Sequence, residues 1–181
     1  MKVIFLDIDG VLNSSDYLHA TYGLRRAQAE KRKLDIKDIN AGLQQTRDKF
    51  GQLFDPRCVA HLARIIEHTG AIIVVSSTWR YSGTKGLQEL WDSRDLPGEI
   101  YDITKPPGMP LSFETSERWM GHEIKDWLLS HPYVKDYVIL DDDSDMLDEQ
   151  KEHFVQTSTE FGLTFETSSH AIKILNHTEE P

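Results

Sequence analysis

Three short apolar stretches, each followed directly by polar residues, constrain the fold of this chain more than any other feature. They are Val3–Leu6, Ala71–Val75 and Tyr137–Leu140. Their length and β-branched content predict buried strands, and the segments between them contain helical patterns. Such alternation favours a parallel α/β sheet. Because parallel strands end at the same edge of a sheet, the polar residues that follow them are expected to meet there.

Capping residues and periodicity predict the remaining elements. Asp55 as N-cap, Pro56 at the first helical position and Gly70 as C-cap predict a helix between them. The last helix of the chain is expected to have Ser168 or Ser169 as its N-cap. Further helices are expected at residues 87–92, 115–130 and 169–176, and further strands at residues 99–104 and 154–156.

The length of the chain indicates one domain, and its charge is unevenly distributed. The 181 residues are 39% hydrophobic, which fits a single globular domain over residues 1–181. Residues 13–54 show no strand pattern and are expected to form helices and loops. Within them, Leu24–Lys49 carries eight Lys/Arg and four acids, a net charge of +4, against −14 for the rest of the chain. This segment is interpreted either as a solvated helix face or as a basic arm that attracts an anionic substrate.

Several classes of protein are not expected. No apolar run approaches the roughly 20 residues of a membrane-spanning helix, and the N-terminus lacks the apolar region of a secretory signal. Cys58 is the only cysteine, so no internal disulfide can form, and a reducing cytoplasm is the expected location. The eight histidines do not have the spacing of zinc ligands.

The polar residues after the three stretches suit phosphoryl transfer. Asp7 and Asp9 follow the first stretch, Ser76 and Ser77 the second, and Asp141–Asp145 the third. Carboxylates gathered at one edge repel each other unless a hard cation lies between them, and Mg²⁺ prefers oxygen ligands. With the metal bound, one aspartate can attack phosphorus and a second can transfer protons. A hydroxyl and a cationic side chain would hold the phosphoryl oxygens.

Three motifs resemble those of the haloacid-dehalogenase (HAD) superfamily. Asp7-Ile8-Asp9-Gly10-Val11-Leu12 resembles the first motif, D-x-D-G-(T/V)-L. Ile72-Ile73-Val74-Val75-Ser76 resembles the second, and Val138-Ile139-Leu140-Asp141-Asp142 the fourth. Their order and spacing agree with the superfamily, and together they cover most of the chain.

A closer resemblance is to a HAD family associated with RNA-repair proteins. It is carried by Ser76–Arg80, Glu123–Leu128 and Tyr137–Asp145. The resemblance implies a three-layer, Rossmann-like α/β fold with a parallel sheet, in which residues 14–54 form a small helical cap over the active site. It also implies a phosphatase or phosphotransferase that uses Mg²⁺.

The resemblance assigns roles to the aspartates. It implies that Asp7 is the nucleophile and first metal ligand. Asp9 would be the general acid/base and would offer its main-chain carbonyl to Mg²⁺. Asp142 would be a further metal ligand, with Asp141 and Asp145 close by or bridging through water.

The motifs assign the phosphate-binding residues less specifically than they assign the aspartates. Ser76 is expected to bind the phosphoryl group, with Ser77 as the alternative. The third motif requires a basic residue early in the helix before the acidic strand, and the related family places arginine before glycine there. Here Met120 precedes the glycine, so Arg118 is the first choice and Lys125 the second.

Substrate and function alternatives remain open at the level of sequence. The closer resemblance and the basic segment favour a terminal phosphate of RNA or DNA, and small phosphometabolites or nucleotides come second. A non-catalytic metal-binding or scaffold protein is a third interpretation, which the intact Asp7 and Asp9 oppose. A calcium sensor is a fourth: the acids from Asp141 to Glu152 resemble an EF-hand loop, but Met146 stands where glycine is expected.

Overall fold

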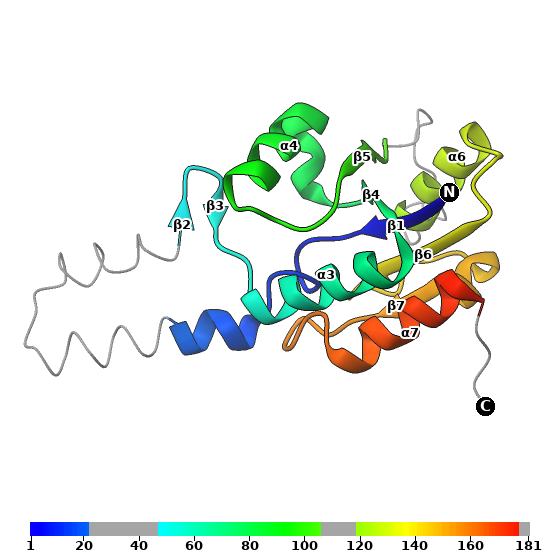
Figure 1. Cartoon of the computed structure of the whole chain (residues 1–181). Coiled ribbons are helices and arrows are strands. Elements are labelled where there is room, and N and C mark those ends of the chain that lie inside the picture. Colours follow the sequence, from blue (N-terminus) through cyan, green and yellow to red (C-terminus); the bar gives the residue numbers. More distant parts are fainter. Residues whose placement is uncertain (22–46, 106–118, 178–181) are drawn as a thin grey trace, which may run out of the picture.

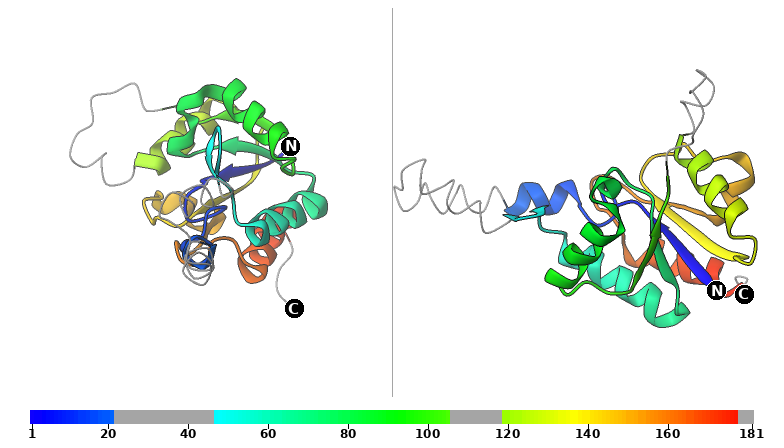
Figure 2. Two further views of the ribbon diagram at one scale, coloured as in Figure 1. Left: turned by 90° about the vertical axis from the view of Figure 1, so that its left-hand side faces the viewer. Right: turned by 90° about the horizontal axis from the view of Figure 1, so that it is seen from above.

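The computed structural model describes residues 1–21, 47–105 and 119–177, and its centre is a five-stranded parallel sheet (Figure 1). The strands are β1 (Lys2–Leu6), β4 (Ile72–Val75), β5 (Ile100–Ile103), β6 (Asp136–Asp141) and β7 (Phe154–Gln156). Their order is β5-β4-β1-β6-β7, so β1 lies in the middle between β4 and β6 (Figure 2). Apolar side chains on both faces of β1 and β4 explain why these strands read as continuous apolar runs.

Helices cover both faces of the sheet and complete three layers, which confirms the predicted α/β fold (Figure 1). Side chains of α3 and α7 share one core with alternate residues of β1, including Ile4 and Leu6. On the other face, α6 packs through Ile124 and Trp127 against Val3 and Phe5. The helices are α3 (Pro56–Thr69), α4 (Gly83–Ser93), α6 (Trp119–Ser130) and α7 (Phe165–Asn176), with 3₁₀ helices η2 (Thr78–Ser82) and η3 (Asp148–His153).

The caps of α3 are the predicted ones. Asp55 accepts a hydrogen bond from the Arg57 backbone N–H at 2.9 Å, and Gly70 ends the helix with a φ of 65°. The helix α7 differs from the prediction, because it begins at Phe165 and not at Ser169. Its N-cap is Thr164, whose hydroxyl accepts a hydrogen bond from the Thr167 N–H at 3.2 Å.

The insertion contains strand structure that the sequence did not indicate. Residues 15–21 are helical as expected, but β2 (Arg47–Asp48) and β3 (Gly51–Gln52) form an antiparallel pair. The expectation of no strand in this segment is therefore wrong, since two-residue strands are too short to show an alternating pattern. The predicted helical cap and the basic arm fall largely within residues 22–46, outside the described part of the chain. Both described ends lie beyond the carboxyl ends of the sheet strands, at the left in Figure 1.

The two ends of the insertion are joined in the core of the domain. Ser14 donates a hydrogen bond from its hydroxyl to Asp55 at 2.6 Å, and the Asp55 N–H donates to the Leu12 carbonyl at 2.9 Å. Asp48 of β2 is bound by Arg94, which donates from Nε and Nη2 at 2.8 Å each. In the three described ranges, no helix is both long and apolar enough to cross a bilayer.

Candidate active site

Strand register brings the three polar clusters together. Leu6 is paired with Val75 on one side and with Leu140 on the other, so the three strands end at one level. The ladder continues one step further, because the Asp7 N–H donates to the Leu140 carbonyl at 3.0 Å and the Ser76 N–H donates to the Leu6 carbonyl at 2.9 Å. This places the residues after each strand side by side at the carboxyl edge of the sheet.

Three carboxylates converge at this edge. Asp7, Asp141 and Asp142 each offer an oxygen, and these oxygens all lie within 4.8 Å of one another. Asp142 accepts a hydrogen bond from the Thr159 hydroxyl at 2.5 Å, which orients its carboxylate. Asp7 and Asp142 thus meet as the sequence predicts, and Asp141 is a direct member of the cluster.

Burial and mutual repulsion disfavour the charged forms of these groups. Burial, opposed by hydrogen bonds and assisted by the charges of Asp9 and Asp142, raises the pKa of Asp7 to about 7. Burial and the nearby charge of Asp7 raise the pKa of Asp141 to about 8. Burial also raises the pKa of Asp145, whose carboxylate accepts a hydrogen bond from the Met120 N–H at 3.1 Å. A divalent cation bound between these carboxylates would favour their charged forms again.

Asp9 lies outside this carboxylate cluster. Its side chain is exposed, and both of its oxygens accept hydrogen bonds. Asn13 Nδ2 donates to Asp9 Oδ1 at 2.9 Å, and Trp79 Nε1 donates to Asp9 Oδ2 at 2.9 Å. The carboxylate of Asp9 thus lies at the surface, close enough to the cluster for its charge to act on Asp7.

The two serines after β4 have different partners. The Ser77 hydroxyl hydrogen-bonds the Asp7 carboxylate and lowers its pKa against the effect of burial. The Ser76 hydroxyl lies 3.3 Å from Thr104 Oγ1, at the end of β5. Both side chains are buried, so both hydroxyls are part of the ordered lining of the site.

A buried ion pair supports this lining, and sequence reasoning missed it. Arg80 is 8% exposed and Glu123 is fully buried, and their side chains form an ion pair of 2.8 Å. Arg80 also donates to the Ser77 carbonyl at 3.1 Å, and Glu123 accepts from Thr104 Oγ1 at 2.9 Å and from the Trp119 indole. Both residues lie in stretches that carry the closer resemblance, Ser76–Arg80 and Glu123–Leu128, but no local pattern pairs side chains 43 positions apart.

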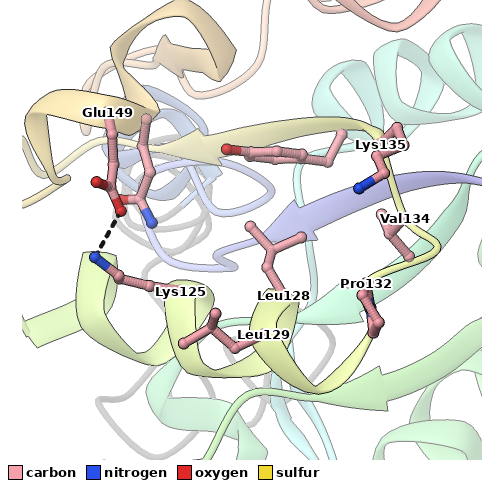
Figure 3. Close-up of a pocket in the computed structure, with 9 residues that line it drawn as sticks. Lys125, Leu128, Leu129, Pro132, Val134, Lys135 and Glu149 are labelled. Carbon is pink, nitrogen blue, oxygen red and sulfur yellow. Dashed lines mark ion pairs between the residues drawn. The ribbon is translucent and has the colours of Figure 1, made fainter.

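Of the two predicted third-motif residues, Lys125 alone belongs to the described part of the chain. Arg118 lies outside the described residues. Lys125 forms an ion pair of 2.9 Å with Glu149 and lies at the mouth of a surface pocket of about 410 Å³ (Figure 3). Leu128, Leu129, Pro132 and Val134 supply apolar walls, and none of the clustered aspartates lines this pocket. The structure thus places Lys125 with Glu149 on the α6 side of the molecule.

The acidic run is not arranged as a calcium-sensor loop. An EF-hand needs a helix before its first ligand, whereas the residues before Asp141 form the strand β6. Two members of the run, Asp141 and Asp142, combine instead with Asp7 from β1. The alternative EF-hand interpretation therefore has no support in the fold.

Comparison with known proteins agrees with the motifs and the fold. Residues 3–167 match the family described as the HAD domain in Swiss Army Knife RNA repair proteins. No curated protein and no solved structure matched the chain. The matched range includes all of the five-stranded sheet except Lys2, together with the three clustered aspartates, and HAD domains of this kind point to a phosphatase-type hydrolase. The chain belongs to the family of HAD domains of Swiss Army Knife RNA repair proteins.

Proposed function

We propose that this protein is a Mg²⁺-dependent phosphatase that hydrolyses phosphomonoesters through an aspartyl-phosphate on Asp7. The observation that carries the proposal is the convergence of Asp7, Asp141 and Asp142 at the carboxyl edge of the parallel sheet. Membership of a HAD family supports the reaction class. In α/β sheets of this kind, ligands bind beyond the carboxyl ends of the strands.

The donor set fits Mg²⁺. Three carboxylates lie within reach of one ion. Burial and mutual repulsion raise the pKa values of Asp7 and Asp141, and a bound cation would oppose both effects. Asp7 and Asp142 are the proposed side-chain ligands, the main-chain carbonyl of Asp9 is a third, and Asp141 and Asp145 are the supporting acids. When bound, the metal would reduce repulsion between the carboxylates and the anionic phosphoryl group.

The chain's own residues divide the reaction into two steps. In the first, an Asp7 carboxylate oxygen attacks phosphorus, the bond to the leaving oxygen breaks, and Asp9 gives that oxygen a proton. In the second, Asp9 takes a proton from water, the water oxygen attacks phosphorus, and the bond to Asp7 breaks to release inorganic phosphate. Ser76, Ser77 and Arg118 are the proposed ligands of the phosphoryl oxygens.

For the substrate, we propose a terminal phosphate of RNA or DNA. The family name refers to RNA repair, and the basic segment Leu24–Lys49 carries a net charge of +4 in a chain of net charge −10. A positively charged segment in an otherwise acidic chain would attract a polyanion and would do so less at high salt. Small phosphomonoesters are the competing substrate class.

The first prediction tests the chemistry. Purified protein should release phosphate from p-nitrophenyl phosphate with Mg²⁺, and EDTA should abolish this release. Asp7→Asn removes the attacking carboxylate and should lower kcat on the order of a thousandfold or more. Asp126→Asn makes the same chemical change at an exposed position on α6 and should leave kcat unchanged.

The same preparation decides the substrate class. Phosphate release should be compared for oligonucleotides with a 3′- or 5′-phosphate, free nucleotides and a panel of phosphorylated metabolites. We expect the highest kcat/KM for an oligonucleotide, with KM rising with salt concentration. A preference for small phosphomonoesters would contradict the nucleic-acid proposal and leave the phosphatase intact. Binding of Mg²⁺ without turnover of any substrate would contradict the phosphatase.

A further inference from the structure

The indole of Trp79 connects three parts of the molecule at the edge of the site. Its Nε1–H donates to Asp9 Oδ2 at 2.9 Å, across 70 positions of sequence. Its ring packs edge-on against Phe54, with 5.6 Å between ring centroids and 67° between planes. It also lies beside strand β3, where a Cβ on Gly51 would be 3.8 Å from Trp79 Cη2. One rigid side chain thus contacts an exposed carboxylate, the core and the insertion.

The geometry restricts the motion of the Asp9 side chain. An exposed carboxylate ordinarily turns among several rotamers. Here Asn13 holds one oxygen and Trp79 holds the other. An indole N–H can only donate a hydrogen bond, and the Trp79 ring is half-buried and fixed by its packing against Phe54. The direction of the Asp9 carboxylate is therefore set by residues of η2 and of the turn after β1.

We propose that Trp79 is a positioning residue that holds the Asp9 carboxylate in the orientation needed for proton transfer. The inference rests on the proposed function, in which Asp9 gives a proton to the leaving oxygen and later takes one from water. The Trp79 N–H proton itself is not transferred.

The test uses substrates that differ in their need for a proton donor. An alkyl leaving group requires protonation, whereas p-nitrophenolate departs as a stable anion. Trp79→Phe keeps an aromatic ring against Phe54 and removes the N–H. It should lower kcat about tenfold for the best alkyl phosphomonoester of the substrate screen and less than about twofold for p-nitrophenyl phosphate.

Trp127→Phe is the matched control. The Trp127 indole also donates to an aspartate, Asp102, at 2.7 Å, but it packs on the other face of the sheet against Phe5. Its loss should change kcat for both substrates by the same factor. In an Asp9→Ala background, Trp79→Phe should cause no additional loss with the alkyl substrate, because the two residues act as one unit.

A spectroscopic measurement tests the contact without turnover. The indole N–H signal of Trp79, assigned by its absence in Trp79→Phe, should move in Asp9→Ala, while that of Trp127 stays in place. An equal loss of kcat for both substrates, a change in KM alone, or an unmoved indole signal would overturn the positioning role and leave the phosphatase standing. A wild-type protein that hydrolyses no phosphomonoester would overturn the proposed function, and the positioning role with it.

Discussion

Gly10 shows how closely the backbone after β1 approaches the opposite wall of the site. Its φ of 72° lies in the left-handed region, and a Cβ built on it would be 2.1 Å from Asp142 Cγ. The Gly10 carbonyl also accepts a hydrogen bond from Thr157 Oγ1 at 2.8 Å, which ties this turn to the end of β7. Glycine is needed here both for the backbone conformation and for the space that the Asp142 carboxylate occupies.

Gly10→Ala should therefore disturb the metal site, whereas Gly70→Ala should not. Gly70 has a φ of 65° but has open space around its Cβ position, so alanine there should cost only about 1–2 kcal/mol of backbone strain. Alanine at Gly10 would have the same backbone strain, and its Cβ would in addition clash with the Asp142 carboxylate and displace it. Urea unfolding should show a larger loss of stability for Gly10→Ala, and calorimetric titration should show weaker Mg²⁺ binding for this variant alone. Equal unfolding costs and unchanged Mg²⁺ binding would contradict the role of Gly10.

At the same scale, sequence could name most residues of the site but not their contacts. The motifs identified Asp7 and Asp142, and these side chains do meet. Sequence left open whether Ser76 or Ser77 would bind the phosphoryl group, because consecutive residues after a strand point in different directions. The bond from Trp79 to Asp9 joins residues 70 positions apart, and such a contact depends on tertiary packing that no local pattern records.

At the scale of elements, the start of α7 illustrates an ambiguous capping signal. Thr164, Thr167, Ser168 and Ser169 are all good N-cap residues, so the sequence alone does not choose among them. The fold decides, because the Ser168 side chain is buried and accepts a hydrogen bond from Arg64 at 3.0 Å. Strand β1 and the two caps of α3 were predicted correctly. Their local sequence preferences agree with the packing that the whole fold requires.

The cap assignment can be tested by two alanine substitutions. Thr164→Ala removes the hydroxyl that accepts from the Thr167 N–H and should lower the free energy of unfolding by about 1 kcal/mol. Ser169→Ala removes a hydroxyl that lies inside the helix and donates to the Phe165 carbonyl, so it should cost less than about 0.5 kcal/mol. Urea unfolding of both variants measures the difference, and a larger cost at Ser169 would favour the start expected from sequence.

At the scale of the whole molecule, the acidic site couples global stability to pH and metal. In the metal-free protein the pKa of Asp7 is about 7 and that of Asp141 about 8, both above the value of 3.8 for a free side chain. Carboxyl groups whose pKa is raised in the folded protein make their full contribution to stability below about pH 4. This contribution to stability is lost as the pH rises through their folded-state pKa values, near 7 and 8. Mg²⁺ requires the ionised forms, so it replaces protons at this site.

The stabilisation by Mg²⁺ should therefore increase with pH. The rise in Tm on adding saturating Mg²⁺, against EDTA at matched ionic strength, should be larger at pH 8.5 than at pH 5.5. Asp7→Asn removes one of the titrating carboxylates and should reduce the difference between the two pH values. An equal rise in Tm at both values would mean that the clustered carboxylates do not bind the ion.

The bond between Ser14 and Asp55 has an evolutionary consequence. The insertion of about forty residues begins and ends at neighbouring positions of the domain. Its two ends are held together by hydrogen bonds of Ser14 and Leu12 with Asp55. The entropy of closing such a loop changes only slowly with its length, so residues can be added, removed or exchanged there at small cost to folding. The segment can therefore vary among relatives while the clustered aspartates stay in place at the edge of the sheet.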